Sequence, residues 1–151
     1  MKLETDRMPV KEPAIKEDTS KISLPLGLVG FPEITEAEIV FVEEELPFMR
    51  LHSSGEAQVH FLVLNPMGIL PDYEIELVDQ DIAYLGIQSA EDVLLLNIAT
   101  VHASNPLKIS VNLIGPIVIN RKTRVGKQVV IGNHMDFSAR HMLFEEPAAE
   151  A

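Results

Sequence analysis

The sequence predicts a mainly β fold: a small antiparallel, β-barrel-like single domain with one or two short helices. Short segments rich in Val, Ile, Leu and Phe recur along the chain, and Pro, Gly, Asn and Ser separate them. Only one segment combines helical spacing with a terminating glycine. The 151 residues suffice for one domain that buries its own core without a disulfide or a structural metal.

The folded domain is expected to span residues 21–144. Residues 1–20 mix Lys, Glu, Asp, Pro and Thr, and no apolar period holds through them. We therefore expect 1–20 to be a mobile leader, and it lacks the apolar stretch of a signal peptide. Residues 145–151 are acidic and rich in Ala, so we expect a fraying acidic tail.

Seven segments bounded by turn-forming residues are predicted to be strands. Residues 73–77 alternate apolar and acidic side chains, which places Glu74 and Glu76 together on a solvent-facing side. Continuous apolar runs at 94–96 and 117–119 are typical of strands buried on both faces, although a short buried helix has the same pattern. The predicted strands are 39–42, 48–52, 59–64, 73–77, 93–101, 109–119 and 128–131.

A short helix is predicted to follow the 73–77 strand. Asp79 is expected to cap its N-terminus, Asp81 lies in its first turn, and two apolar side chains follow three residues apart. Gly86 is expected to end it in the left-handed conformation. A second, single turn is expected at residues 89–92, directly before the next strand.

Charge is unevenly distributed along the chain. There are 23 Asp and Glu against 12 Lys and Arg, a formal net charge of −11. Residues 51–107 contain eight carboxylates and no Lys or Arg, whereas 108–144 contain six bases and a single acid. This pattern indicates a negative field that attracts cationic partners, unless the charges only keep the surface soluble. It argues against a nucleic-acid backbone as the main partner.

Recognisable catalytic and metal-binding motifs are missing from the sequence. The absence of Cys excludes thiolate catalysis, Cys-ligated zinc, iron–sulfur clusters and disulfides, and fits a reducing cytoplasm. The five His lack metal-ligand spacing, and a calcium loop at Asp79 fails at Ala83 and Tyr84. Phosphate-binding glycine motifs and a G-x-S-x-G turn are also missing. A triad scattered along the chain stays open, and no run is apolar enough for a membrane span.

Two loops rich in Gly and Pro, 25–32 and 65–73, carry an unusual number of apolar side chains. Leu28 and Phe31 belong to the first loop, and Met67, Ile69 and Tyr73 to the second. If the strand order brings the loops together at one barrel end, they form a contact patch for another protein. The alternative is that these side chains plug the barrel ends.

These segments, taken in order, resemble the family of the flagellar assembly factor FliW. No single piece is specific, but the ordered set is, and it spans about residues 22–141. The leader and the acidic tail lie outside the pattern. The matching pieces are LGLVGFP at 26–32, EEE and PF at 43–48, NP and PDY at 65–73, D, L, G and I at 81–87, AEDV at 90–93, and PIVIN followed by T and GKQ at 116–128.

The resemblance implies a small cytoplasmic protein without catalytic activity or cofactor. It implies two alternative protein partners, which are the RNA-binding translational repressor CsrA and flagellin. It further implies that flagellin awaiting export captures such a protein and leaves CsrA free to repress flagellin mRNA. Export of flagellin would then free the protein to antagonise CsrA.

The candidate partner-binding residues combine the apolar side chains of the two loops with the carboxylates that follow them. Two other functions stay open: a small-ligand-binding or enzymatic β-barrel with a closed pocket, and direct RNA binding through the basic segment 121–127. That segment contains no aromatic side chain for base stacking, so we expect neither a nucleic-acid partner nor a membrane. The candidate site residues are Leu28, Phe31, Met67, Ile69, Asp72, Tyr73, Glu74 and Glu76, and the basic residues are Arg121, Lys122, Arg124 and Lys127.

Overall fold

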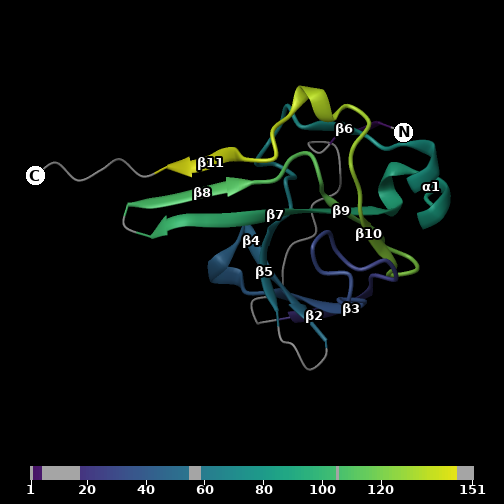
Figure 1. Cartoon of the computed structure of the whole chain (residues 1–151), viewed down its shortest axis with the longest axis horizontal. Helices are drawn as coiled ribbons and strands as arrows, with labels where there is room; N and C mark the ends of the chain where they lie inside the picture. Colours follow the sequence, from purple (N-terminus) through teal and green to yellow (C-terminus); the bar gives the residue numbers. More distant parts are fainter. Residues whose placement is uncertain (1, 5–17, 55–58, 105, 146–151) are drawn as a thin grey trace, which may run out of the picture.

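The structure is a computed structural model that describes residues 2–4, 18–54, 59–104 and 106–145. Within them, a nine-stranded antiparallel sheet forms the body of the molecule, and a two-stranded ribbon lies beside it (Figure 1). The helical elements are short, which confirms the mainly β prediction. They are α1 (Asp79–Leu85), η2 (Glu43–Glu45), η3 (Ala90–Asp92) and η4 (His134–Asp136).

The strands of the large sheet follow the order β10-β9-β7-β5-β4-β3-β2, and β8 joins β7 and β11 off this path. The ribbon pairs β1 with β6. The bounds are β1 (Lys2–Glu4), β2 (Asp18–Ser23), β3 (Glu36–Phe41), β4 (Phe48–Ser53), β5 (His60–Leu64), β6 (Glu74–Glu76), β7 (Val93–Ser104), β8 (Leu107–Val111), β9 (Ile117–Asn120), β10 (Gly126–Gln128) and β11 (His141–Glu145).

The large sheet curls like a barrel without closing. Its two ends meet beside β10, where the N–H of Ser23 donates a 2.9 Å hydrogen bond to the carbonyl of Arg124. Ser23 and Val125 form an isolated parallel bridge there rather than a strand pair. The barrel-like expectation therefore describes the curvature of the sheet and not its hydrogen bonding.

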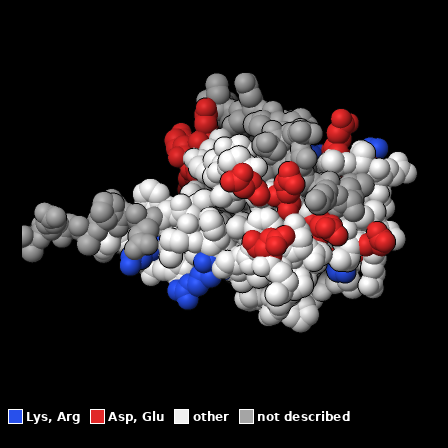
Figure 2. All heavy atoms as spheres, turned by 90° about the horizontal axis from the view of Figure 1, so that it is seen from above, with Lys and Arg blue, Asp and Glu red and all other residues white. Residues whose placement is uncertain are grey.

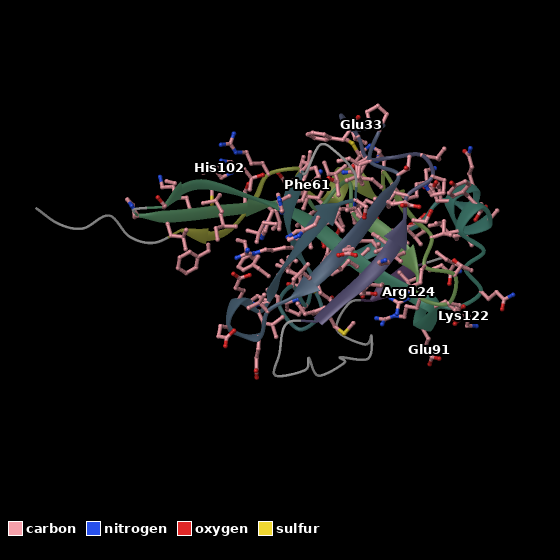
Figure 3. All side chains as sticks on the ribbon, turned by 90° about the horizontal axis from the view of Figure 1, so that it is seen from below. Glu33, Phe61, Glu91, His102, Lys122 and Arg124 are labelled. Atoms are coloured by element: carbon pink, nitrogen blue, oxygen red, sulfur yellow. The ribbon has the colours of Figure 1, made fainter. Side chains whose placement is uncertain are left out.

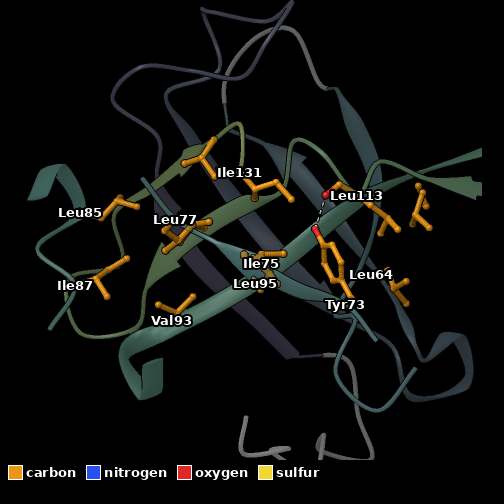
Figure 4. Packing of buried hydrophobic residues seen from close by; sticks show 14 of the residues in the cluster. Leu64, Tyr73, Ile75, Leu77, Leu85, Ile87, Val93, Leu95, Leu113 and Ile131 are labelled. Atoms are coloured by element: carbon orange, nitrogen blue, oxygen red, sulfur yellow. Dashed lines mark hydrogen bonds between the residues drawn. The ribbon is translucent and has the colours of Figure 1, made fainter. Parts of the chain in front are cut away.

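Both faces of the central strands are buried. In β9, Val118 packs into one cluster around Tyr73, whereas Ile117 and Ile119 pack into a second cluster around Leu51. We call these the Tyr73 cluster, drawn in Figure 4, and the Leu51 cluster. The strand prediction from the apolar runs at 94–96 and 117–119 is confirmed, since these runs lie in β7 and β9 with side chains in both clusters.

The predicted position and C-terminal end of the helix are confirmed, but the predicted N-cap residue is wrong. Gly86 ends α1 with φ 65°, the left-handed conformation expected. Val78, not Asp79, occupies the N-cap position and makes no side-chain cap. Asp79 and Asp81 lie instead in the first turn, where negative charge favours the helix dipole. The turn expected at 89–92 is η3.

The segment 109–119 was predicted as one strand and forms two, β8 and β9. The Asn112 side chain separates them, because its Oδ1 accepts hydrogen bonds from the N–H groups of Ile114 and Gly115 at 3.0 and 2.9 Å. Such an Asx turn redirects the backbone. The last predicted strand, 128–131, is also shifted: β10 pairs with β9 over Gly126–Gln128.

The expected domain boundaries need correction at both ends. β2 begins at Asp18 and pairs with β3 along its whole length, so the folded part starts before residue 21. Lys2–Glu4 pairs with β6, and residues 5–17 of the expected leader lie outside the described residues. Glu145 of the expected tail belongs to β11, a strand that was not predicted, and 146–151 lie outside the described residues.

The end of β7, residues 100–104, continues with β8 and β11 as a three-stranded ribbon that projects from the body (Figure 1). We call this ribbon the arm. Its register shifts twice, between Val101 and Ala103 in β7 and between Met142 and Phe144 in β11.

Candidate protein-binding surfaces

The structure does not bring the two apolar loops together. Leu28 is 4% exposed in the Leu51 cluster, and the Phe31 ring packs edge-on against Phe61 at 5.2 Å. Met67 packs instead against the Tyr73 cluster, while Ile69 is 40% exposed. Most of these side chains therefore hold the core, and the single two-loop patch that the sequence suggested does not form.

Tyr73 is buried and anchors its loop. Its hydroxyl donates a 2.6 Å hydrogen bond to the carbonyl of Leu113, drawn in Figure 4, and accepts one from Asn97 Nδ2 at 3.0 Å. Burial raises the pKa of Tyr73 far above its ordinary value, against a smaller lowering by the Asn97 hydrogen bond. Tyr73 therefore positions the neighbouring surface from below, with 2% of its surface exposed.

A groove of about 400 Å³ lies between the end of the 65–73 loop and the segment 136–141. Tyr73 and Phe137, whose rings meet edge-on at 5.0 Å, form its floor with Leu113. The exposed carboxylates of Asp72 and Asp136 lie at its rim. Sequence reasoning identified Asp72 and Tyr73, but missed the wall from 136–141, because nothing local pairs two segments so far apart in the chain.

β6 adds two further carboxylates beside this rim. Glu74 and Glu76 are exposed on either side of the buried Ile75, as the alternation predicted. Asn133 fixes the strand, since its Oδ1 accepts from the Glu76 N–H and its Nδ2 donates to the Glu74 carbonyl, both at 2.8 Å. Figure 2 looks down on the end of the molecule that carries β6 and shows many carboxylates over the body. We call Asp72, Glu74, Glu76 and Asp136 the acidic face.

The basic hairpin between β9 and β10 is tied to its neighbours. Lys127 Nζ lies 2.5 Å from Asp81, and Lys122 Nζ lies 3.2 Å from Asp92 and, by hydrogen bonding, lowers the pKa of that carboxyl. Arg121 donates from Nε to the Val93 carbonyl at 3.0 Å. These contacts support a structural role for the hairpin over an RNA-binding one.

The remaining Arg of the hairpin, Arg124, donates to Ser20 Oγ at 2.8 Å and lies beside Lys122 in Figure 3. Arg121 is partly buried, and this burial, followed by repulsion from Arg124, lowers its pKa. Lys122 and Arg124 are exposed, but each of the four cations already has a hydrogen-bond or ion-pair partner in the described chain, whereas a phosphate-binding surface needs cations that are free to contact the nucleic-acid backbone.

The described residues form neither a metal site nor a membrane-spanning helix. Over residues 2–4, 18–54, 59–104 and 106–145, no three His, Asp or Glu side chains are placed to hold a metal ion. In this part of the chain, no helix has the length and apolar character needed to cross a bilayer. Asp72, Asp136 and Ser138 lie on the exposed rim of the groove, and His141 is the half-buried polar residue among the residues that line it, so the groove lacks the converging set of polar groups typical of a small-molecule site.

A family model described as "FliW protein" matches residues 4–143. This chain belongs to the FliW family. The match begins at residue 4, so most of the expected leader is part of the family sequence, contrary to the pattern taken to start near residue 22. An assembly factor has protein partners, so the groove and the acidic face matter in a FliW protein as surfaces for binding other proteins.

Relatives and a solved structure agree with this assignment. The flagellar assembly factor FliW of Clostridium novyi (strain NT) is 39% identical over 146 residues, which cover 97% of this chain and 99% of that protein. The protein of the same description from Clostridium botulinum (strain Langeland) is 37% identical, with 87% of this chain and 91% of that protein covered. A crystal structure of the flagellar assembly factor FliW superposes with a TM-score of 0.72 at 31% identity, covering 95% of this chain and 97% of that one.

Proposed function

We propose that this FliW protein binds the translational repressor CsrA in the cytoplasm and opposes its binding to RNA. Flagellin competes for the FliW protein, so flagellin synthesis follows flagellar assembly. Family membership supports this function, and the observation that carries the CsrA contact is the acidic face beside an apolar groove.

Charge complementarity favours CsrA as the partner of the acidic face. A protein that binds RNA must present clustered Lys and Arg to the phosphates. Asp72 and Asp136 are exposed at the groove, and Glu74 and Glu76 are exposed on β6, which follows Asp72 in the chain, so these carboxylates attract such a cationic surface and speed its encounter. Tyr73 and Phe137 then offer an apolar floor to one buried side chain of the partner, the usual centre of binding energy in an interface.

The same charge gives a mechanism for antagonism. The FliW protein has a formal net charge of −11, and RNA is a polyanion. A bound FliW protein beside the RNA-binding groove of CsrA raises the free energy of bringing phosphates there, and dissolved salt screens this repulsion. Overlap of the two binding sites on CsrA is not required.

The binding experiment compares two double variants with equal changes in charge. We expect Glu74→Lys with Glu76→Lys to slow association with CsrA about tenfold or more at low salt, and the difference to disappear near 0.5 M salt, where screening acts over a few ångströms. Glu33→Lys with Glu91→Lys changes two exposed carboxylates elsewhere and serves as the control. Equal association rates for both double variants would contradict a role of the acidic face.

The antagonism is tested with labelled RNA added to preformed complexes of the FliW protein and CsrA at two salt concentrations. Repulsion by the field predicts inhibition that weakens as the salt concentration rises. Inhibition that is independent of salt would point instead to steric blockage or a conformational change of CsrA.

A further inference from the structure

A chain of hydrogen bonds on the arm holds a guanidinium at the protein surface. His102 Nε2 lies 2.5 Å from Ser110 Oγ, and Arg140 Nη2 lies 3.2 Å from His102 Nδ1. A guanidinium can only donate, so Nδ1 of His102 accepts and Nε2 carries the hydrogen that points to Ser110. Ser110 is 3% exposed, whereas His102, labelled in Figure 3, and Arg140 are exposed. A buried hydroxyl therefore fixes an exposed cation.

Arg140 has no carboxylate partner among the described residues. Its side chain contacts His102, and its backbone N–H donates to Ser138 Oγ at 3.0 Å. Other cations are neutralised, for example Lys122 by Asp92 and Lys127 by Asp81. Like Arg124, which donates to Ser20 Oγ, Arg140 has an oriented guanidinium without an acid among the described residues, and its fork matches an incoming carboxylate.

An apolar side chain accompanies this cation. The strand register places Thr100, Ser110 and Met142 opposite one another, so they share one face of the arm, and the His102 ring reaches Ser110 on it. Met142 is 41% exposed there. Met adapts to varied apolar partners because its side chain is flexible and polarizable. This face of the arm thus offers one cation and one apolar contact to a protein surface.

We propose that the arm face formed by Arg140, His102 and Met142 is a second protein-docking surface, which receives a segment with carboxylates next to apolar side chains. The inference rests on the proposed function and assigns this surface to flagellin. The cationic RNA-binding surface of CsrA is repelled by Arg140 and attracted by the acidic face, so charge sorts the two partners between two surfaces.

An RNA occupant fits this face less well than a protein. A single oriented guanidinium lies there, in a protein whose net charge repels phosphates, and the His102 ring on this face is already engaged by Ser110 and Arg140. The position also explains why two protein partners exclude each other. Arg140 is adjacent in sequence to His141, which lines the groove at the acidic face, so both surfaces share one short segment.

The experiment measures the affinity of the full-length FliW protein for purified flagellin and for purified CsrA by calorimetry, together with the thermal midpoint. We expect Arg140→Glu to weaken flagellin binding about tenfold or more, because it places like charges opposite each other. Met142→Ser is expected to weaken it several-fold through the lost apolar contact. Both variants should keep CsrA affinity within about twofold of the wild-type value, as expected for changes outside its contact surface.

Two matched controls separate local from general effects. Arg124→Glu makes the same change in charge at an exposed Arg beside Ser20. Phe144→Ser removes an exposed apolar side chain, 48% exposed, that lies opposite Ile109 and therefore on the other face of the arm. Both controls are expected to leave flagellin affinity within about twofold of the wild-type value.

Each outcome decides between the two proposals. Wild-type protein that binds neither flagellin nor CsrA would overturn the proposed function, and this assignment with it. If Arg140→Glu and Met142→Ser bind flagellin as tightly as the wild-type protein does, the assignment of the arm face to flagellin is overturned and the proposed function is not. The same assignment is overturned if the two variants lose affinity for CsrA instead of flagellin. It is also overturned if the wild-type protein binds labelled RNA and Arg140→Glu abolishes that binding. If Arg140→Glu lowers the thermal midpoint, Met142→Ser decides.

Discussion

The hydroxyl of Tyr73 donates a 2.6 Å hydrogen bond to the carbonyl oxygen of Leu113 and so joins the loop before β6 to the turn after β8. Asn97 completes the network, since its Nδ2 donates to the same hydroxyl at 3.0 Å. These polar groups lie within the apolar Tyr73 cluster, directly beneath the groove. The shape of the groove therefore depends on a few buried hydrogen bonds.

Tyr73→Phe should destabilise the protein by about 1–3 kcal/mol, because it leaves the Leu113 carbonyl without its donor in a buried site. Urea unfolding at neutral pH measures the change. The difference in free energy of unfolding between the wild type and the variant should shrink above about pH 10. Burial raises the pKa of Tyr73 in the folded state, so Tyr73 ionises first in the unfolded wild-type chain, and this ionisation favours unfolding of the wild type alone. If Tyr73→Phe is as stable as the wild type at pH 7, the hydrogen bonds of the Tyr73 hydroxyl do not contribute to the stability of the protein.

Phe31→Ala and Ile69→Ala are expected to have opposite effects. Phe31 packs against Phe61 in the Leu51 cluster, so truncating it should cost about 2 kcal/mol or more in stability and leave CsrA affinity unchanged. Ile69 is 40% exposed and neighbours Leu70 of the groove, so its truncation should cost little stability and weaken CsrA binding. Thermal midpoints and affinities of both variants test this pair, and equal losses of stability would contradict it.

Lys122→Gln should lower the thermal midpoint at pH 7 but not at about pH 2. The hydrogen bond from Lys122 lowers the pKa of Asp92 in the folded state. A lowered carboxyl pKa stabilises the protein above the unfolded-state value of about 4, and this contribution is lost as the pH falls through the folded-state pKa. Thermal scans at several pH values measure the difference. A constant difference at all pH values would show that Lys122 acts through packing and not through its charge.

Gly27→Ala should destabilise the protein strongly. Gly27 has φ +69°, and a Cβ there would lie 2.5 Å from the Pro32 carbonyl oxygen. Left-handed backbone costs a non-glycine residue about 1–2 kcal/mol, and relief of the clash adds to this. Gly30→Ala is the control, because Gly30 has φ +82° with open space around its Cβ position. We expect Gly30→Ala to show the conformational cost alone in urea unfolding, and similar losses for both variants would contradict the clash.

Local patterns were sufficient to place elements and insufficient to pair them. Alternation found β6, and Gly86 marked the end of α1, because both signals depend on neighbouring residues. Leu28 and Tyr73 are both apolar side chains of loops rich in Gly and Pro, so the sequence suggested one patch for both. They lie in different clusters, because the strand order that separates them is set by long-range pairing. The 136–141 wall of the groove and strand β11 were missed for the same reason.

The register shift in β11 affects how copies of this protein meet. In the described part of the chain β11 pairs with β8 alone, so its other edge is open to an additional strand. The extra residue Leu143 places Met142 opposite Ser110 and Phe144 opposite Ile109, on opposite faces of the arm. A second β11 running antiparallel could not match faces along its length, and a bulged edge is a poor template for stacking strands. The arm can expose Met142 and Phe144 on its two faces without offering the straight edge from which fibrils grow.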